Sequence, residues 1–224
     1  MMDFAAMRDR MVREQLAAPG RDISNERVLG AMLSVPRHEF VPVEIVADAY
    51  ADMALPIGEG QTISQPFVVA RMTELVDPRR EDRVLEVGGG CGYQAAVLGE
   101  LTGTVVSLEI VEGLARKADE TIKRLGYLNV EMLHGDGHAG LVEMAPFDVI
   151  LVACAAATVP GALVDQLAEG GRMIMPVGPR ARQELRLIKK RHGRIEESAV
   201  LPVRFVPMTG GSISGDTSAT TMGG

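Results

Sequence analysis

Short apolar runs alternate with amphipathic stretches through most of the chain after residue 80. Five of the runs are strand-like, and the stretches between them have the spacing of helices. The strands are predicted at 83–87, 104–109, 129–133, 147–153 and 172–176, and the helices near 92–101, 111–125 and 160–168. Strands that alternate with helices predict an α/β fold, with a doubly wound, mostly parallel sheet covered on both faces. Two more runs, 184–190 and 199–206, flank His192-Gly193 and predict a closing antiparallel pair.

The residues before 80 are predicted to be mainly helical. Apolar residues at helical spacing predict an amphipathic helix over 3–18. Ser24 is expected to cap a second helix that ends before Pro36, and Pro66 suits the first turn of a third. The pattern between these helices is irregular, and it predicts an extended connector at 37–42 and a well-ordered loop at 50–65.

Length and composition indicate one domain with a short tail. The chain has 224 residues, of which 46% are hydrophobic and 24% are charged, as in an ordinary globular protein. We expect a single domain over 1–210, in which a segment of helices and a loop (1–80) precedes a ligand-binding core (81–210). Residues 211–224 turn to Ser, Thr and Gly without apolar periodicity, and they predict a disordered tail.

The run Glu86-Val87-Gly88-Gly89-Gly90-Cys91-Gly92-Tyr93 overlaps the end of the first strand of this core. Glycines at a strand-to-helix turn let the backbone approach a nucleotide, and Glu109, at the end of the next strand, can accept hydrogen bonds from both ribose hydroxyls. A dinucleotide fingerprint needs a third glycine where Tyr93 stands, and the ring of Tyr93 is expected to crowd a pyrophosphate. The spacing E-x-G-x-G-x-G fits a smaller nucleoside better. The turn therefore predicts S-adenosylmethionine as the cofactor and a methyltransferase as the enzyme class.

Charge and composition argue against several other partners. A net charge of −7 argues against nucleic acid, and the basic run 189–194 is expected to be an exposed hairpin tip. No apolar run approaches the roughly 20 residues of a membrane helix, and the N-terminus does not have the pattern of a signal peptide. Neither the two cysteines, Cys91 and Cys154, nor the four histidines have metal-ligand spacing. We expect a cytoplasmic protein with free thiols, no metal, no nucleic-acid partner and no membrane contact, and we favour a monomer.

The segment from Leu55 to Pro66 is too polar and glycine-rich for a core segment and too specific for a plain linker. Together with the glycine turn, it resembles the protein-L-isoaspartate O-methyltransferase family over about residues 5–209. The run Thr62-Ile63-Ser64-Gln65-Pro66 is the most diagnostic part. The resemblance also includes the runs 35–42, 92–98, 135–137, 145–148, 169–172, 176–178 and 204–207, in the family's order.

The resemblance implies an enzyme that repairs damaged proteins and has the Rossmann-like fold of S-adenosylmethionine-dependent methyltransferases. Proteins of this family transfer a methyl group from S-adenosylmethionine to the α-carboxylate of an L-isoaspartyl residue, whose main chain runs through the β-carbon. The neighbouring amide nitrogen then displaces methanol and closes a succinimide, which hydrolyses partly to normal aspartate. The implied partners are isoaspartyl-containing proteins and peptides.

Ser64 matches the serine that the family uses next to the point of methyl transfer. The resemblance implies that its hydroxyl orients the substrate carboxylate without acting as a nucleophile. The alternative is that Ser64 merely caps the helix that begins at Pro66. No catalytic base is expected, because a carboxylate with an ordinary pKa of about 4 is already ionised at neutral pH.

The remaining candidates are implied to contact the cofactor. Gly88 and Gly90 would let the backbone approach its methionine part, and Glu109 would bind the ribose. Asp136 and Gly137 match the turn that contacts adenine in the family, with an ordinary Asp-Gly turn as the alternative. Further cofactor candidates are Ile63, Gln65, Val68, Glu86 and Thr209.

The chain departs from the family pattern at three positions. It carries Gly89 and Cys91 where the family more often has small hydroxyl residues, and Ala157 where the family often has proline. We expect Gly89 to loosen the turn and the missing hydroxyl to remove a hydrogen bond to the cofactor. For Cys91, the role of a small buried filler is favoured over that of a redox switch.

Three alternative functions stay open. The first is a relative that methylates a normal aspartate in one dedicated peptide partner. The second is a catalytically inactive, S-adenosylmethionine-binding interaction module, which the intact segment around Ser64 disfavours. The third is an NAD-dependent oxidoreductase, which Tyr93 disfavours.

Overall fold

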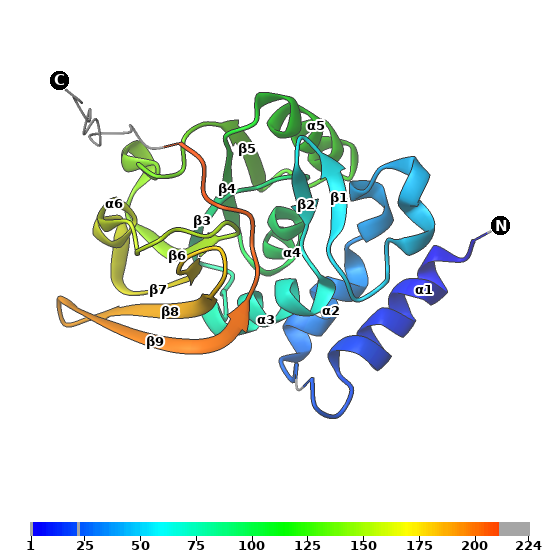
Figure 1. Ribbon diagram of the computed structural model, residues 1–224, viewed down its shortest axis with the longest axis horizontal. Helices are drawn as coiled ribbons and strands as arrows, with labels where there is room; N and C mark the ends of the chain where they lie inside the picture. The colour runs from blue at the N-terminus through cyan, green and yellow to red at the C-terminus, as the bar shows by residue number, and fades with distance from the viewer. Residues whose placement is uncertain (1, 22, 211–224) are drawn as a thin grey trace, which may run out of the picture.

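A seven-stranded sheet in the order β5-β4-β3-β6-β7-β8-β9 forms the centre of the computed structural model, which describes residues 2–21 and 23–210 (Figure 1). The first five strands of this order run parallel, and β8 and β9 are antiparallel to their neighbours. The predicted doubly wound α/β fold is confirmed. The strands are β3 (Arg83–Val87), β4 (Thr104–Glu109), β5 (Val130–His134), β6 (Phe147–Val152), β7 (Leu167–Val177), β8 (Gln183–Arg191) and β9 (Arg194–Val203).

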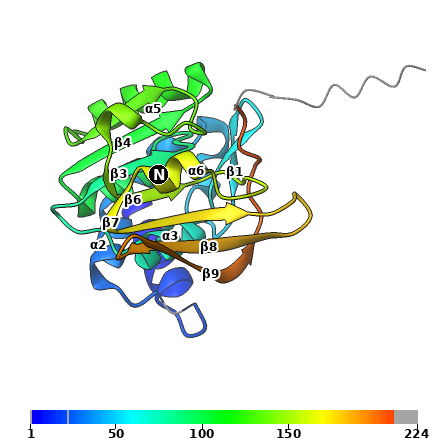
Figure 2. The same ribbon diagram turned by 90° about the vertical axis from the view of Figure 1, so that its left-hand side faces the viewer.

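Helices cover both faces of the sheet, because alternate strand residues are buried on opposite sides. Val84 belongs to the core on one face, and the next residue, Leu85, to the core on the other. The first face is covered by α2 (Glu26–Ser34), α3 (Pro66–Val76), α4 (Tyr93–Leu101) and α5 (Glu112–Arg124), and the second by α6 (Gly161–Asp165). Figure 2 shows the strands in order from β4, near α5, down to β9 at the opposite edge.

The order of the strands reverses between β3 and β6. From β3 the chain adds β4 and β5 on one side, and it then returns to add β6 and β7 on the other side. The carboxyl ends of these parallel strands, at Val87, Glu109 and Val152, lie at the same edge of the sheet. In open α/β sheets, ligands bind at this reversal point. The fold therefore places the glycine turn and the residues after β6 side by side at the expected ligand site.

The N-terminal helices form, with two differences from the prediction. α1 (Phe4–Arg10) continues into a π-helical stretch, Met11–Leu16, whose apolar residues are buried. The cap of α2 is Asn25, whose side chain accepts hydrogen bonds from the first turn. The prediction that Ser24 is the cap is wrong, because Oδ1 of Asn25, one residue closer to the helix, already accepts from the N–H groups of Arg27 and Val28.

The connector predicted to be extended at 37–42 begins with a turn of 3₁₀ helix, Arg37–Phe40, and a second 3₁₀ segment follows at Val43–Asp48. Arg37 and Phe40 are both buried. An extended chain would place residues three apart on opposite sides, whereas a 3₁₀ helix aligns them on one side. Burial of this pair on the same side therefore favours the helix over the strand.

The loop predicted at 50–65 contains an antiparallel hairpin of β1 (Leu55–Gly58) and β2 (Gln61–Ile63). Its strands are only four and three residues long, too short for alternation to be recognised in the sequence. Figure 1 shows the hairpin beside the segment 204–210, which follows β9. The hairpin thus faces the C-terminal segment across the ligand edge of the sheet.

The predicted closing pair is confirmed in β8 and β9, which turn at His192-Gly193. Both turn residues have positive φ, and their N–H groups donate to the Glu169 carboxylate. The tip of the basic run is exposed, as expected. The predicted tail at 211–224 lies outside the described residues. Within residues 2–21 and 23–210, no helix has the length and apolar character needed to cross a membrane.

Candidate functional site

The glycine turn after β3 has a backbone that side chains would strain. Gly88 and Gly90 have φ of 85° and 54°, in the left-handed region that favours glycine. The N–H of Gly88 donates to the carbonyl of Leu108 on β4 at 2.8 Å. The N–H of Gly90 donates to Oε2 of Glu109 at 2.7 Å. The turn is thereby fixed to the end of the neighbouring strand.

Glu109 lies beside this turn, as the sequence predicts. Its second oxygen, Oε1, accepts from the N–H of Val111 at 2.9 Å, and the side chain is buried. A carboxylate has about four acceptor positions, and two of them are occupied by these backbone groups. Glu109 lines a cavity, here called the turn cavity, together with Gly88, Gly90, Gly137 and Thr209. Its remaining acceptor positions are available to hydroxyl groups in that cavity.

Glu86 is buried in β3 beneath the turn. The hydroxyl of Ser107 on β4 donates to its Oε2 at 2.5 Å, whereas its Oε1 has no partner among the described residues. Burial raises the pKa of Glu86 to about 8. It lines a second cavity, the inner cavity, with Ile63, Ser64 and the glycine turn. A cationic ligand group, such as the ammonium group of S-adenosylmethionine, would favour the ionised form of Glu86 and give Oε1 a donor.

Ser64 stands between β2 and α3, but it does not cap the helix. The N–H of Phe67 in the first turn of α3 donates to Oδ1 of Asp52 at 3.2 Å, and Nε2 of Gln65 donates to Oδ2 at 2.9 Å. Asp52 therefore takes the capping role that was the alternative for Ser64. The Ser64 hydroxyl makes no hydrogen bond within the described part of the chain.

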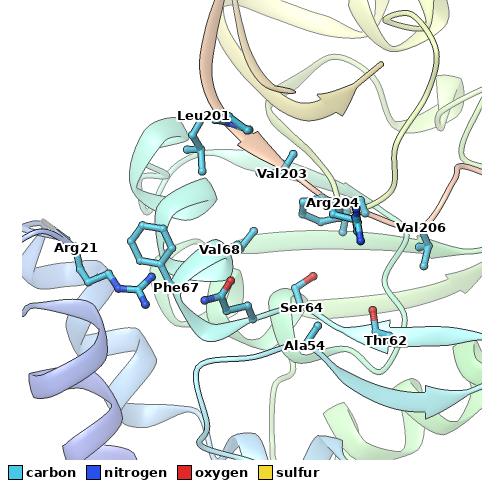
Figure 3. A pocket seen from close by; sticks show the side chains of 14 residues that line it. Arg21, Ala54, Thr62, Ser64, Phe67, Val68, Leu201, Val203, Arg204 and Val206 are labelled. Carbon is cyan, nitrogen blue, oxygen red and sulfur yellow. The ribbon is translucent and has the colours of Figure 1, made fainter. Parts of the chain in front are cut away.

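A third, larger cavity lies on the outer side of Ser64. This outer cavity has a volume of about 520 Å³, and Figure 3 shows it between α3, the end of β9 and the residues around Ser64. Its apolar wall includes Phe67, Val68 and Val203, and Gln65 also lines it. Ser64 lines both this cavity and the inner cavity. Its hydroxyl therefore stands where an outer ligand would meet an inner one.

The adenine-site candidates lie at the turn after β5. The glycines on either side of Asp136, which include Gly137, line the turn cavity, whereas Asp136 is not among its described lining residues. Oδ1 of Asp136 accepts from the N–H of His138 at 2.9 Å, and the carboxylate lies against Gly210. A Cβ on Gly137 would lie 2.2 Å from Cγ1 of Val87, so close packing also requires this glycine.

The structure corrects the physical argument about Tyr93. Its side chain is only 1% exposed and packs edge-on against Phe40, with ring centroids 5.6 Å apart. The ring lies in the core, so the expectation that it crowds a pyrophosphate is wrong. Tyr93 therefore does not distinguish a dinucleotide from S-adenosylmethionine, and the choice between these two cofactors depends on the other residues of the site and on the family.

Gly89 is tightly packed, so the expectation that it loosens the turn is also wrong. A Cβ at this position would lie 2.2 Å from Oγ of Ser107 and 2.8 Å from Cε of Met132. The N–H of Gly89 also donates to the carbonyl of Leu108 at 3.0 Å. The hydroxyl of Ser107 thus occupies the space that a side chain at 89 would need.

The two cysteines have protonated thiols. Burial raises the pKa of Cys91 to about 11 and that of Cys154 to about 12. The thiol of Cys91 is therefore unreactive at neutral pH, which supports the filler role over the redox switch. Over residues 2–21 and 23–210, no group of three or more His, Cys, Asp or Glu side chains is arranged to hold a metal ion.

Two residues outside the predicted set connect the cavities. Thr62 on β2 and Ala153 directly after β6 line the outer, turn and inner cavities. The sequence places Ala153 after a strand at the cofactor edge, where small side chains are expected to leave room for a peptide backbone. Thr62 alternates with the buried Ile63 on a strand that the sequence pattern did not reveal.

Comparisons with known proteins agree with this geometry. The model of the protein-L-isoaspartate(D-aspartate) O-methyltransferase family matches residues 8–213. A protein-L-isoaspartate O-methyltransferase of Opitutus terrae is 53% identical over 203 residues, which cover 90% of this chain and 86% of the relative. One of Methanoculleus marisnigri is 49% identical and covers 91% of each chain.

A solved structure adds a bound ligand to the comparison. The Plasmodium falciparum protein described as a protein-L-isoaspartate O-methyltransferase, in complex with S-adenosyl-L-homocysteine, superposes with a TM-score of 0.80 at 27% identity. The match covers 93% of this chain and 99% of the other. The chain therefore belongs to the protein-L-isoaspartate(D-aspartate) O-methyltransferase family.

Proposed function

We propose that the protein transfers a methyl group from S-adenosylmethionine to the α-carboxylate of L-isoaspartyl residues in damaged proteins and peptides. The observation that carries this proposal is the position of Ser64, whose side chain borders both the outer and the inner cavity. An acceptor in the outer cavity would meet, at Ser64, a donor bound along the glycine turn. Membership of the family supports the same activity.

The cofactor would lie along the carboxyl ends of β3, β4 and β5. S-adenosylmethionine supplies a methyl group activated by its sulfonium centre. Glu109 would accept from the ribose hydroxyls, Glu86 would face the methionine end, and Asp136 and Gly137 would flank the adenine. Ile63, Gly88, Gly90 and Thr209 line the turn and inner cavities and complete the proposed binding set. Gln65 and Val68, also predicted to contact the cofactor, line only the outer of the three cavities, so they would reach it from the acceptor side of Ser64.

The turn cavity alone is smaller than this ligand. Its volume is about 50 Å³, whereas ligand pockets are on the order of 300–1,000 Å³. Its cover consists of Gln61 and Thr62 on the hairpin and of Val206–Thr209 on the C-terminal segment. The cofactor would extend from the turn cavity into the inner cavity, which shares Thr62 and Ala153 with it.

The residues around Ser64 would align the reacting atoms instead of moving protons. The acceptor carboxylate is already ionised, so it can attack the methyl carbon directly, and sulfur leaves with the bonding electron pair. The Ser64 hydroxyl would donate to one carboxylate oxygen and direct the other towards the methyl group. Such alignment can supply on the order of 7–11 kcal/mol of the barrier. Asp52 would support it by fixing the residues that follow Ser64.

The test compares two peptides that differ only in the linkage of one residue. Purified protein is incubated with radiolabelled S-adenosylmethionine and either an isoaspartyl peptide or its aspartyl twin, and base-labile methyl ester is counted. We expect label on the isoaspartyl peptide alone. Label mainly on the aspartyl twin would support a dedicated aspartate methyltransferase, and label on neither peptide would contradict methyl transfer. A monomeric, cytoplasmic enzyme that binds neither nucleic acid nor membranes stays a prediction.

A further inference from the structure

Arg37 is a completely buried cation without a carboxylate partner in the described part of the chain. Its side chain has 0% exposure. Nε donates to the carbonyl of Ala49 at 2.7 Å, Nη2 donates to the carbonyl of Ser64 at 2.8 Å, and Nη1 has no partner among the described residues. The guanidinium carbon also lies 4.7 Å from the centroid of the Tyr93 ring.

These contacts join segments that are far apart in the sequence. Arg37 lies 27 residues before Ser64, and Tyr93 begins the helix that follows the glycine turn. The guanidinium therefore connects the main chain at Ser64 to the turn that would carry the cofactor. The backbone carbonyl is held, so the Ser64 hydroxyl stays available to a ligand.

An unpaired buried charge is not an efficient way to stabilise a core. Burial lowers the pKa of Arg37, which reflects the cost of removing its charge from water. Apolar side chains of similar volume often stabilise a buried position as well or better. What an apolar residue cannot do is hold two carbonyl oxygens in a fixed geometry. The contacts of Arg37 thus indicate a geometric role at Ser64.

We propose that Arg37 is a positioning residue for methyl transfer, which holds the main chain at Ser64 against Tyr93 and so fixes the distance between acceptor and donor. This inference rests on the proposed function, because it assumes that Ser64 orients the acceptor. Without Arg37, the segment at Ser64 would sample several positions. Turnover would fall, whereas contacts to the ribose end of the cofactor, at Glu109, would remain.

The test uses Arg37→Met, Arg37→Lys and a matched control, Arg172→Met. Arg172 also donates to two backbone carbonyls, those of Val76 and Asp77, and unlike Arg37 it pairs with a carboxylate, that of Asp82. It lines none of the three cavities. Each variant is assayed with the isoaspartyl peptide for kcat and KM, with S-adenosylhomocysteine by calorimetry for Kd, and by thermal unfolding. Rates are counted per site that binds S-adenosylhomocysteine, so loss of folded protein does not lower them.

We expect Arg37→Met to lower kcat by about tenfold or more, with the Kd for S-adenosylhomocysteine within about threefold of the parent value. Arg37→Lys can reach one carbonyl and should restore part of kcat. Arg172→Met should lower the unfolding temperature and leave kcat per site unchanged. Equal kcat in the parent and both Arg37 variants would overturn the inference. If Arg37→Met does not fold, an unchanged kcat in Arg37→Lys would be enough to overturn the inference.

A double-mutant cycle with Ser64→Ala separates this inference from the proposed function. If Arg37 acts through Ser64, the loss caused by Ser64→Ala should shrink to less than about threefold in the Arg37→Met background. Additive losses would overturn the role of Arg37 and leave the proposed function intact. Absence of methyl transfer by the parent protein would overturn the proposed function and this inference with it.

Discussion

Ser107 and Glu86 occupy the same register on the neighbouring parallel strands β4 and β3, and the hydroxyl of Ser107 donates to Oε2 of Glu86 at 2.5 Å. The pair lies directly beneath the glycine turn, where Glu86 is fully buried and its Oε1 has no partner within the described residues. One hydrogen bond does not offset the burial of this carboxylate, so its pKa is raised to about 8. Glu86 is therefore protonated at neutral pH when no ligand is bound.

Because Glu86 is protonated in the folded protein, we predict that its ionisation lowers the free energy of unfolding as the pH rises. In the unfolded chain the carboxyl ionises at its ordinary pKa, so between that value and a pKa of about 8 the folded state binds more protons than the unfolded state. The free energy of unfolding should fall across this window by at most about 1.4 kcal/mol per pH unit. The substitution Glu86→Gln keeps the shape of the side chain but removes the group that ionises.

The measurement is chemical unfolding of the parent and of Glu86→Gln without cofactor, from pH 5 to pH 8. The stability of Glu86→Gln relative to the parent should rise steadily with pH. A difference that does not change with pH would show that Glu86 does not titrate in this range. Exposed Glu112→Gln, on the same edge of the sheet, serves as the control.

Ser64→Ala should remove most of the turnover and leave cofactor binding intact. The hydroxyl makes no bond that holds the described part of the fold together, so its loss should not change the unfolding temperature. We expect kcat for an isoaspartyl peptide to fall by about tenfold or more, and the Kd for S-adenosylhomocysteine to stay within about twofold. Ser24→Ala, on the surface before α2, is the matched control. Full turnover in Ser64→Ala would remove Ser64 from the mechanism.

Glu109→Ala should weaken cofactor binding. The carboxylate holds the N–H groups of Gly90 and Val111, so its loss would remove the ribose acceptors and also loosen the turn. We expect calorimetry to show affinity for S-adenosylhomocysteine lowered by about tenfold or more, which corresponds to about 1.4 kcal/mol. Glu112→Ala, close in sequence but outside the cavities, should bind normally. Unchanged affinity in Glu109→Ala would refute the assignment of Glu109 to the ribose.

Gly89→Ala should destabilise the protein through its contact with Ser107. The added Cβ would lie 2.2 Å from Oγ of Ser107, and overpacking of this kind costs about 1–3 kcal/mol. In a Ser107→Ala background the nearest clash disappears, so the same substitution should cost less. Urea unfolding of both single variants and the double variant measures this coupling. Strictly additive losses would contradict this coupling. They would place the cost of the added Cβ at another contact, for example at Cε of Met132, 2.8 Å away.

The parts of the fold that the sequence predicts well are those with local signals. The strands at 83–87 and 104–109 are mostly apolar, buried runs that each begin with an exposed polar residue, and they form where expected. Glu109 could be identified because its role follows from its place at the end of a strand after a glycine turn. Gly88 and Gly90 could be identified because such a turn requires positive φ.

The parts that the sequence does not predict depend on contacts between distant residues. Asp52 caps α3 from 15 residues away, so the local pattern suggested Ser64 as the cap instead. Arg37 contacts the carbonyl of Ser64 across 27 residues, and nothing in its neighbours marks it as buried. The packing of Ser107 against Gly89 likewise exists only after two strands pair. Hydrophobic periodicity predicts which face of a helix or strand is apolar, but it does not predict which distant residue contacts that element.

Conversion of isoaspartate to aspartate by the purified protein tests the proposed function most directly. An isoaspartyl peptide is incubated with the protein and S-adenosylmethionine, and the products are separated by chromatography and identified by mass spectrometry. We predict a methyl ester first, then loss of methanol to a succinimide, and then a growing share of the aspartyl peptide. If the isoaspartyl peptide stays unmodified while the protein binds S-adenosylhomocysteine, the proposed function is wrong.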